Sequence, residues 1–262
     1  MTLSGISARH ITSSQNPRYK LWKSYLKDAA NAECPLIAVE GRKQVLELAK
    51  TRVPELLLLS MSLDMTGLET LTKSSSPLYY LPDRLFTQLS AVEHNQGIVA
   101  FFKKPCWTRY DLTDRVICLD SLQDPGNLGT IIRTAAALGG FSIVSCGESV
   151  SFYNEKVVRA SAGYLFSVPF LADLKPGHLR KIGYQIWYSF PGQGTPLPAA
   201  DFITPLAVVF GSEGRGLNAA EISETGKKLT IPMGGDIDSL NVAVASSLVM
   251  YEINRRVIRA DG

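Results

Sequence analysis

Three segments in the second half of this 262-residue chain place glycine beside polar and charged side chains directly after an apolar run. They span residues 120–133, 210–217 and 229–245. If each apolar run is a strand of a parallel sheet, each segment follows the carboxyl end of a strand, which is where ligands bind in such sheets. The three segments therefore predict one ligand site assembled from loops that are distant in the sequence.

The first segment carries a turn, a helix start and a cation. Asp124-Pro-Gly126 predicts the turn, and Asn127 is expected to cap the helix that follows. Arg133 lies between one and two helical turns further on, among alanine, isoleucine and leucine side chains. Its guanidinium either extends into solvent, which propensity alone favours, or points into a site.

The second segment sets three glycines within six residues around the carboxylate of Glu213. Glycines at this density let backbone amides approach a ligand closely, although a surface turn would have the same composition. Their order, Gly-x-x-Gly-x-Gly, differs from the dinucleotide fingerprint, and the sequence has no Gly-x-x-x-x-Gly-Lys phosphate loop. NAD and ATP are therefore poor candidates for the ligand.

The third segment leaves a short strand through a proline and paired glycines, forms a polar loop and enters the last helix. Ser239 is expected to cap that helix, and capping would also account for Asn241. The polar side chains of this segment therefore have an ordinary structural explanation as well as a chemical one.

The elements that would position these segments alternate in type. Strands that alternate with helices predict a mainly parallel sheet, and a run that is apolar throughout, such as 206–210, suits a strand covered on both faces. The predicted elements are strands at 116–119, 141–145, 206–210 and 229–231 and helices at 127–138 and 241–259.

The first part of the chain predicts a separate, smaller α/β domain. A charged, proline-containing stretch at 103–109 is typical of a linker, so the expected domains are 1–105 and 106–262. Residues 1–110 hold 14 Lys and Arg against 9 Asp and Glu, and this modest basic surplus suits contact with nucleic-acid phosphates. The predicted elements of this domain are strands at 36–39, 55–60 and 97–102 and helices at 19–30 and 42–50.

Composition argues against several classes of protein. No run of about 18 apolar residues occurs and the first residues lack the pattern of a signal peptide, so we expect a cytoplasmic protein with no membrane partner. The four cysteines stand far apart, and no pair has the spacing of a zinc knuckle or a redox site, so no metal is expected.

Together and in this order, the three segments closely resemble the signature motifs of the SpoU/TrmH family of the SPOUT superfamily, which are S-adenosylmethionine-dependent RNA ribose 2′-O-methyltransferases. The resemblance covers roughly 116–257, and 11–20 and 39–42 resemble the small RNA-binding domain that often precedes the catalytic one. The matching motifs are Asn127-x-Gly129-x-x-x-Arg133, Phe210-Gly-x-Glu-Gly-x-Gly216, and Ile231-Pro-Met with Ser239-Leu-Asn-Val242.

The resemblance implies an α/β fold with a C-terminal SPOUT domain, in which a mainly parallel sheet ends in a deep trefoil knot. It also implies a homodimer, S-adenosylmethionine as cofactor and RNA as substrate. Ribosomal RNA is favoured because tRNA-specific relatives more often lack the N-terminal domain. The residues implied are Gly211, Ile231, Met233 and Leu240 for the cofactor; Arg133, Asn127, Glu213, Ser239 and Asn241 for catalysis; and Arg159, Ser161, Arg18, Lys20 and Arg42 for RNA.

Arg133 matches the family arginine proposed to activate the 2′-hydroxyl. A guanidinium seldom loses its proton, so stabilising the developing alkoxide or holding the adjoining phosphate is physically easier. Two residues depart from the family pattern: Ala243 stands where many members have serine, and Tyr164 where a small residue is commoner. Neither change removes a proposed catalytic group, so activity is expected.

Three alternatives remain open. The first is a tRNA ribose 2′-O-methyltransferase, and the second is a catalytically silent RNA-binding member of the fold, against which the retained polar residues argue. The third is a nucleotide-binding enzyme with an ordinary Rossmann sheet, against which the missing glycine fingerprints argue.

Overall fold

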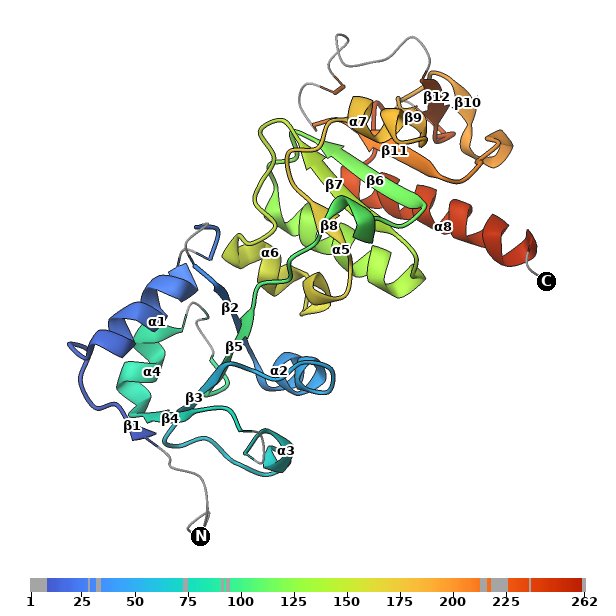
Figure 1. Ribbon diagram of the computed structural model, residues 1–262. Coiled ribbons are helices and arrows are strands. Elements are labelled where there is room, and N and C mark those ends of the chain that lie inside the picture. The colour runs from blue at the N-terminus through green and yellow to red at the C-terminus, as the bar shows by residue number, and fades with distance from the viewer. Residues whose placement is uncertain are drawn as a thin grey trace. The chain divides into compact units, whose positions relative to one another are not determined.

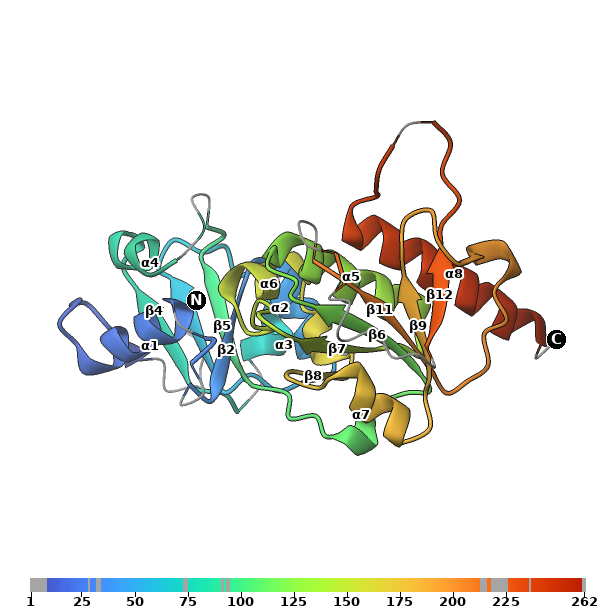
Figure 2. The same cartoon turned by 90° about the horizontal axis from the view of Figure 1, so that it is seen from above.

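A computed structural model shows two compact units (Figures 1 and 2), and each is described by itself. The first comprises Met1–Pro105 with Tyr153–Gly163, and the second comprises Cys106–Phe152 with Tyr164–Gly262. Residues 153–163 therefore group with the first unit, although the sequence placed them inside the second domain. The structure describes residues 9–260 except 28, 32–33, 73–74, 91, 93–94, 213–215, 218–225 and 236, and it leaves out the side chains of 70, 72 and 257–260.

The first unit is built on a five-stranded sheet with the strand order β1-β4-β3-β5-β2. Strand β5 pairs antiparallel with β2 and with the central strand β3, whereas β4 runs parallel to β3 and β1 parallel to β4. The short β1 and the longer β2 are its edges. The strands are β1 (Arg9–His10), β2 (Leu36–Glu40), β3 (Leu56–Ser60), β4 (Leu78–Leu81) and β5 (Ile98–Lys103).

Helices cover both faces of this sheet (Figure 1). Helices α1 (Pro17–Lys27) and α4 (Asp83–Leu89) bury one face, with Tyr19, Trp22 and Phe86 packed against strand side chains. The other face carries α2 (Arg42–Ala49) and α3 (Glu69–Thr72), and α6 (Glu155–Ala160) packs against β2. The burial of these apolar side chains away from water is the main contribution to the stability of the unit.

The described part of the second unit forms a seven-stranded sheet, in which every neighbouring pair is parallel. Their order is β10-β12-β9-β11-β6-β7-β8, so the mainly parallel sheet expected from the sequence is confirmed. The strands are β6 (Arg115–Asp120), β7 (Ser142–Cys146), β8 (Phe170–Leu171), β9 (Gln185–Ser189), β10 (Thr195–Pro196), β11 (Leu206–Phe210) and β12 (Lys227–Thr230).

Helices also lie on both faces of the parallel sheet (Figure 2). Helices α5 (Pro125–Leu138) and α8 (Val242–Ala260) pack against each other on one face, and α7 (Pro176–Lys181) covers the other. All five residues of β11 are buried, as a strand enclosed on both faces requires. The 3₁₀ helices are η1 (Arg109–Asp111), η2 (Tyr164–Phe166) and η3 (Leu197–Ala199).

Each helix and strand predicted from the sequence has a counterpart, with ends shifted by a few residues. The largest shift is in α1, which ends at Lys27 instead of residue 30. The strands and α-helices that the sequence did not predict are β1, β4, β8, β9, β10, α3, α4, α6 and α7, and of these β9 is an interior strand of the parallel sheet. None of the described helices is both long enough and apolar enough to span a membrane.

Candidate active site

A cavity of about 570 Å³ lies in the second unit at the carboxyl ends of β9, β11 and β12. This is the edge of a parallel sheet where ligands bind, and the last wall is the start of α8. The residues that line the cavity are Ser189, Phe190, Pro191, Phe210, Gly211, Ser212, Gly216, Leu217, Ile231, Met233, Ser239, Leu240, Asn241, Val242 and Ala245.

The loop after β11 folds back tightly on itself at Gly211. The backbone N–H of Gly216 donates a hydrogen bond to the carbonyl oxygen of Ser212 over 2.9 Å. A Cβ atom on Gly211 would lie 2.3 Å from the carbonyl carbon of Gly216, well inside van der Waals contact. A residue with a side chain at this position would therefore push apart the two strands of the loop that forms the cavity wall.

The start of α8 is capped by Asn241. Its side-chain oxygen accepts hydrogen bonds from the backbone N–H groups of Ala243 (2.9 Å) and Val244 (3.3 Å). The expectation that Ser239 caps this helix was wrong, because the helix begins at Val242 and the side chain of Ser239 precedes the capping position by two residues. The capping bonds leave the amide group of Asn241 beside the cavity.

The start of α5 is capped by Asp124 and not, as the sequence suggested, by Asn127. The carboxylate of Asp124 accepts from the N–H of Asn127 over 2.7 Å, and Pro125 occupies the first helical position. The side chain of Asn127 is therefore available for another contact, and its oxygen accepts a hydrogen bond from the amide of Asn241 over 3.1 Å. This bond joins the first turns of α5 and α8 at the rim of the cavity.

Arg133 lies outside the cavity. Its side chain is exposed on α5 in a shallow groove that it shares with Tyr164 and with Ser247 and Tyr251 of α8. It forms no ion pair or hydrogen bond with any residue that the structure describes. Glu213, the remaining residue predicted for catalysis, lies outside the described residues.

The four residues predicted to hold the cofactor all line the cavity, together with Ser239 and Asn241. Asn127 is connected to it through Asn241, whereas Arg133 is not brought to it within one chain. The three predicted segments did not include the wall contributed by Ser189, Phe190 and Pro191 after β9. The signal was present, because an apolar strand there runs directly into a proline and a glycine.

The cavity is uncharged over the part that the structure describes, since its lining contains no acidic, basic or histidine side chain. The large pKa shift in this unit lies elsewhere: hydrogen bonds from Arg255 and Arg256 lower the pKa of Glu252 to about 2. No group of three His, Cys, Asp or Glu side chains among the described residues is placed to hold a metal ion. The described lining can enclose and orient a largely apolar ligand, but it contains no acid or base.

The residues predicted to contact RNA are spread over the first unit. Arg18, on α1, donates to the hydroxyl of Tyr79 over 2.8 Å, and Lys20 is exposed on the same helix. Arg42 starts α2 on the opposite face of the sheet, so it does not join them in one patch (Figure 1). Arg159, on α6, forms a 3.7 Å ion pair with the carboxylate of Glu155.

Ser161 does not fit the expected role in RNA binding. Its side chain is completely buried, and its hydroxyl donates to the carbonyl oxygen of Val158 over 2.9 Å. A phosphate cannot reach a hydroxyl that is enclosed in this way, so the residue supports the turn after α6 instead.

The parallel sheet, with a cavity at its carboxyl edge that the second and third motif segments line and that is uncharged over its described part, is that of an S-adenosylmethionine-dependent RNA methyltransferase. Residues 114–251 match the SpoU rRNA Methylase family, and the chain belongs to this family.

Some relatives match over nearly the whole chain and others over about half of it. The 23S rRNA (guanosine(2553)-2′-O)-methyltransferase RlmP of Bacillus subtilis is 27% identical over 94% of this chain and 99% of its own length. The SpoU methyltransferase AviRb of Streptomyces viridochromogenes, solved with AdoMet, is 26% identical, with a TM-score of 0.80 over 93% of this chain and 99% of its own. A structure concerned with 2-OH methylation of C/U34 on tRNA is 27% identical, with a TM-score of 0.51, and covers 56% of this chain and 97% of its own.

Proposed function

We propose that the protein transfers the methyl group of S-adenosylmethionine to a ribose 2′-hydroxyl of ribosomal RNA. The observation that carries this proposal is the cavity at the ends of β9, β11 and β12, because the residues of the second and third signature motifs line it together. A site of this size, about 570 Å³, falls within the range of roughly 300–1,000 Å³ that small-molecule and cofactor sites occupy.

The lining fits S-adenosylmethionine. Gly211 lacks the side chain that would force the loop apart, so backbone groups can approach a ligand there. Ile231, Met233 and Leu240 supply apolar surface for an adenine ring, and the polar groups of Ser239 and Asn241 lie beside them. When bound, this group supplies a methyl on a positively charged sulfur that an oxygen nucleophile can attack in line.

The chain's own contribution is to orient the ribose and to stabilise the attacking oxygen. We assign Arg133 to the oxygen or to the adjoining phosphate, because its guanidinium stays protonated and donates several hydrogen bonds in a fixed plane. Asn127 and Asn241, joined by a 3.1 Å hydrogen bond, position the start of α5 relative to the cavity. We keep Glu213 and Ser239 as further polar groups that contact the ribose or Arg133.

Arg133 lies outside the cavity of its own chain, so the active site is proposed to form in a homodimer, in which each chain supplies this residue to its partner. The surface beside Arg133 supports the proposal. Tyr164, Val244, Leu248 and Tyr251 are large apolar side chains, each exposed by 43% or more. Exposed apolar side chains such as these, on α8 and η2, are typical of a surface that another protein covers.

Further features follow from family membership. We propose that the carboxyl part of the second unit forms the deep trefoil knot of the superfamily. The strand order supports this, because β11 inserts between β9 and β6, and the chain then forms β12 beyond β9 before α8 returns to α5. We also propose that the first unit binds RNA, and that the protein works in the cytoplasm, where its RNA substrate is.

Ribosomal RNA is favoured over transfer RNA by the extent of the similarity. The relative named as a 23S rRNA methyltransferase matches 94% of this chain, whereas the structure concerned with tRNA covers 56%. The retention of Asn127, Arg133 and Asn241 argues against a silent RNA binder, since these residues are what the reaction would require of the chain.

The test is transfer of a labelled methyl group from S-adenosylmethionine to RNA from cells that lack this gene, with ribosomal and transfer RNA separated afterwards. We expect label in ribosomal RNA, at a linkage that resists alkali because its 2′-oxygen is methylated. Label in transfer RNA alone would refute the substrate, and label on a base would refute the reaction. Cofactor binding without transfer to either RNA would favour the silent binder.

A further inference from the structure

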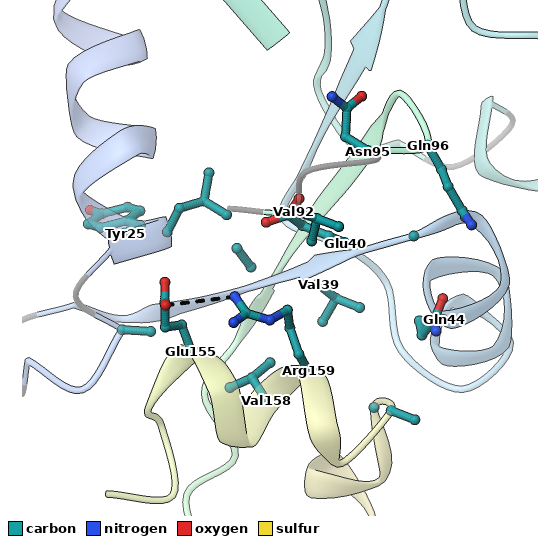
Figure 3. Close-up of a pocket in the computed structure, with 16 residues that line it drawn as sticks. Tyr25, Val39, Glu40, Gln44, Val92, Asn95, Gln96, Glu155, Val158 and Arg159 are labelled. Carbon is teal, nitrogen blue, oxygen red and sulfur yellow. Dashed lines mark ion pairs between the residues drawn. The ribbon is translucent and has the colours of Figure 1, made fainter. Parts of the chain in front are cut away.

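A second cavity, of about 210 Å³, lies in the first unit where α1, β2, α2 and α6 meet (Figure 3). It shares no lining residue with the cofactor cavity. Part of its surface is apolar: Val39 of β2 and Val158 of α6 are almost fully buried, and Tyr25 of α1 packs edge-on against Phe101 with ring centroids 6.4 Å apart. The cavity can therefore receive a flat apolar surface.

The rim of this cavity is polar on both sides. Figure 3 shows Gln44, Asn95 and Gln96 on one side, with Glu155 and Arg159 of α6 facing them from the other. The side-chain oxygen of Gln96 accepts from the backbone N–H of Arg42 over 2.7 Å, which fixes the orientation of that amide. Hydrogen-bonding groups from separate elements therefore converge on one small space.

Gly41 makes part of this arrangement possible. Its φ of +100° is a conformation that residues with a side chain rarely adopt. A Cβ atom at this position would lie 2.6 Å from the side-chain oxygen of Gln44, so the glycine also provides the room for that amide. The local backbone is thus fitted to the position of a polar side chain at the rim.

The turn after α6 is strained where it lines the cavity. Ala162 has a φ of +51°, which disfavours any residue that has a Cβ, and the buried Ser161 holds the turn through bonds to Val157 and Val158. Backbone strain of this kind persists where the surroundings enforce it, and it is concentrated at ligand sites.

The ion pair at the rim can open easily. Arg159 and Glu155 are 3.7 Å apart, and their side chains are exposed by 37% and 35%. A pair this long and this exposed contributes little to stability, so a ligand can recruit the guanidinium at small cost. The dashed line in Figure 3 marks this pair.

We propose that this cavity binds one unpaired nucleotide of the RNA substrate, with its base inside and its phosphate at Arg159. This inference rests on the proposed function and adds to it a base-recognition site distant from the methyl donor. A nucleobase has two apolar faces and a hydrogen-bonding edge, and RNA-binding proteins recognise unpaired bases by stacking and by contacts to that edge.

The charges of the cavity indicate the kind of base. Among the described residues that line the cavity, Glu40 and Glu155 place two carboxylates against the guanidinium of Arg159, which disfavours a free anion. Carboxylates and amide oxygens accept hydrogen bonds, so they select a base edge rich in N–H groups. Guanine presents an N–H and an amino group side by side, so it fits this rim better than uracil, which presents one N–H.

The first test compares Gln44→Ala and Arg159→Ala in the full chain, with Lys156→Ala as the matched control. Lys156 is exposed on the same helix as Arg159 but does not line the cavity. We expect each cavity variant to raise the KM for RNA about tenfold, as the loss of a hydrogen bond to a bound group predicts. The kcat at saturating RNA and the Kd for S-adenosylmethionine should stay within twofold of the control.

The second test does not depend on methyl transfer. The chain with 13C-labelled valine methyls is titrated with 5′-GMP, 5′-UMP and inorganic phosphate, and the signals of Val39 and Val158 are followed. We expect 5′-GMP to shift both signals at lower concentration than 5′-UMP, and phosphate to leave them in place. This measurement tests nucleotide binding in the cavity even if the protein proves not to methylate RNA.

Two results would overturn the inference. One is a KM for RNA in both cavity variants that matches Lys156→Ala, although the wild-type chain methylates RNA. The other is an equal response of Val39 and Val158 to phosphate and to 5′-GMP, which would show that the cavity binds an anion and not a base.

Discussion

Replacing Gly211 with alanine tests how the cofactor cavity is built. The added Cβ would lie 2.3, 2.4 and 2.5 Å from three backbone atoms of Gly216 and Leu217. Ordinary contact begins near 3.4 Å, so the two sides of the loop must separate by about 1 Å. Because all three atoms belong to the backbone, the clash cannot be relieved by turning a side chain.

We expect two effects of Gly211→Ala. Overpacking of this kind costs about 1–3 kcal/mol of stability, measured as the free energy of unfolding in urea. Displacement of the cavity wall should raise the Kd for S-adenosylmethionine at least tenfold, which corresponds to about 1.4 kcal/mol, in isothermal titration calorimetry. The kcat for methyl transfer at saturating cofactor should fall less, because the residues proposed to act on the ribose are unchanged.

Gly234→Ala is the matched control. Gly234 follows the lining residue Met233 and has no positive φ, and no atom of the described residues lies within 4 Å of a Cβ added there. Its Kd for S-adenosylmethionine and its stability should be those of the wild type. If Gly211→Ala also binds the cofactor within twofold of the wild type, the assignment of this cavity to the cofactor is wrong.

Three further variants test other parts of the structure. Arg133→Ala should lower kcat for methyl transfer at least about 100-fold, because it removes a group that stabilises the reacting oxygen. Calorimetry should show an unchanged Kd for the cofactor. Loss of both methyl transfer and cofactor binding would make the residue structural. Asn241→Ala removes the cap of α8 and the hydrogen bond to Asn127, so the free energy of unfolding in urea should fall by about 1–2 kcal/mol. A decrease no larger than that of Val244→Ala would contradict the capping role. The pKa of Glu252 is lowered to about 2, so its carboxylate should stabilise the fold by about 2 kcal/mol above pH 4.5 and lose that contribution as the pH falls toward 2. Glu252→Gln should be less stable at pH 7, and its free energy of unfolding should change less between pH 4.5 and pH 2. Equal acid sensitivity in both proteins would refute this.

The strands of the parallel sheet differed in how well the sequence predicted them. Residues 206–210 are apolar without interruption, so the pattern leaves little choice, and β11 has those bounds. The interior strand β9 was missed because Gln185 and Ser189 are polar and only three residues between them are apolar. A run this short fits a strand or another structure equally well. The pairing of β9 with β11 and β12 decides for a strand, and that pairing cannot be read from the local sequence.

The sequence predicted which residues form the candidate site better than it predicted how those residues are arranged. The motifs predicted which residues would meet at the cavity, such as Gly211 and Met233, since the ends of parallel strands gather at one edge. The prediction that Asn127 caps α5 was wrong, because Asp124 caps this helix, and a proline directly after Asp124 is the sequence signal for that arrangement. The motifs also could not show that Ser161 is buried, because burial depends on how the turn after α6 packs.

The division of the first unit into two stretches of sequence affects how the unit folds during its synthesis on the ribosome. Its edge strand β2 is covered by α6, which is encoded about fifty residues after the unit's first stretch ends at Pro105. At roughly 5–20 residues per second, that edge stays open for several seconds while the intervening residues are made. An uncovered edge strand can pair with other chains, so the nascent protein passes through an interval in which a chaperone would protect it.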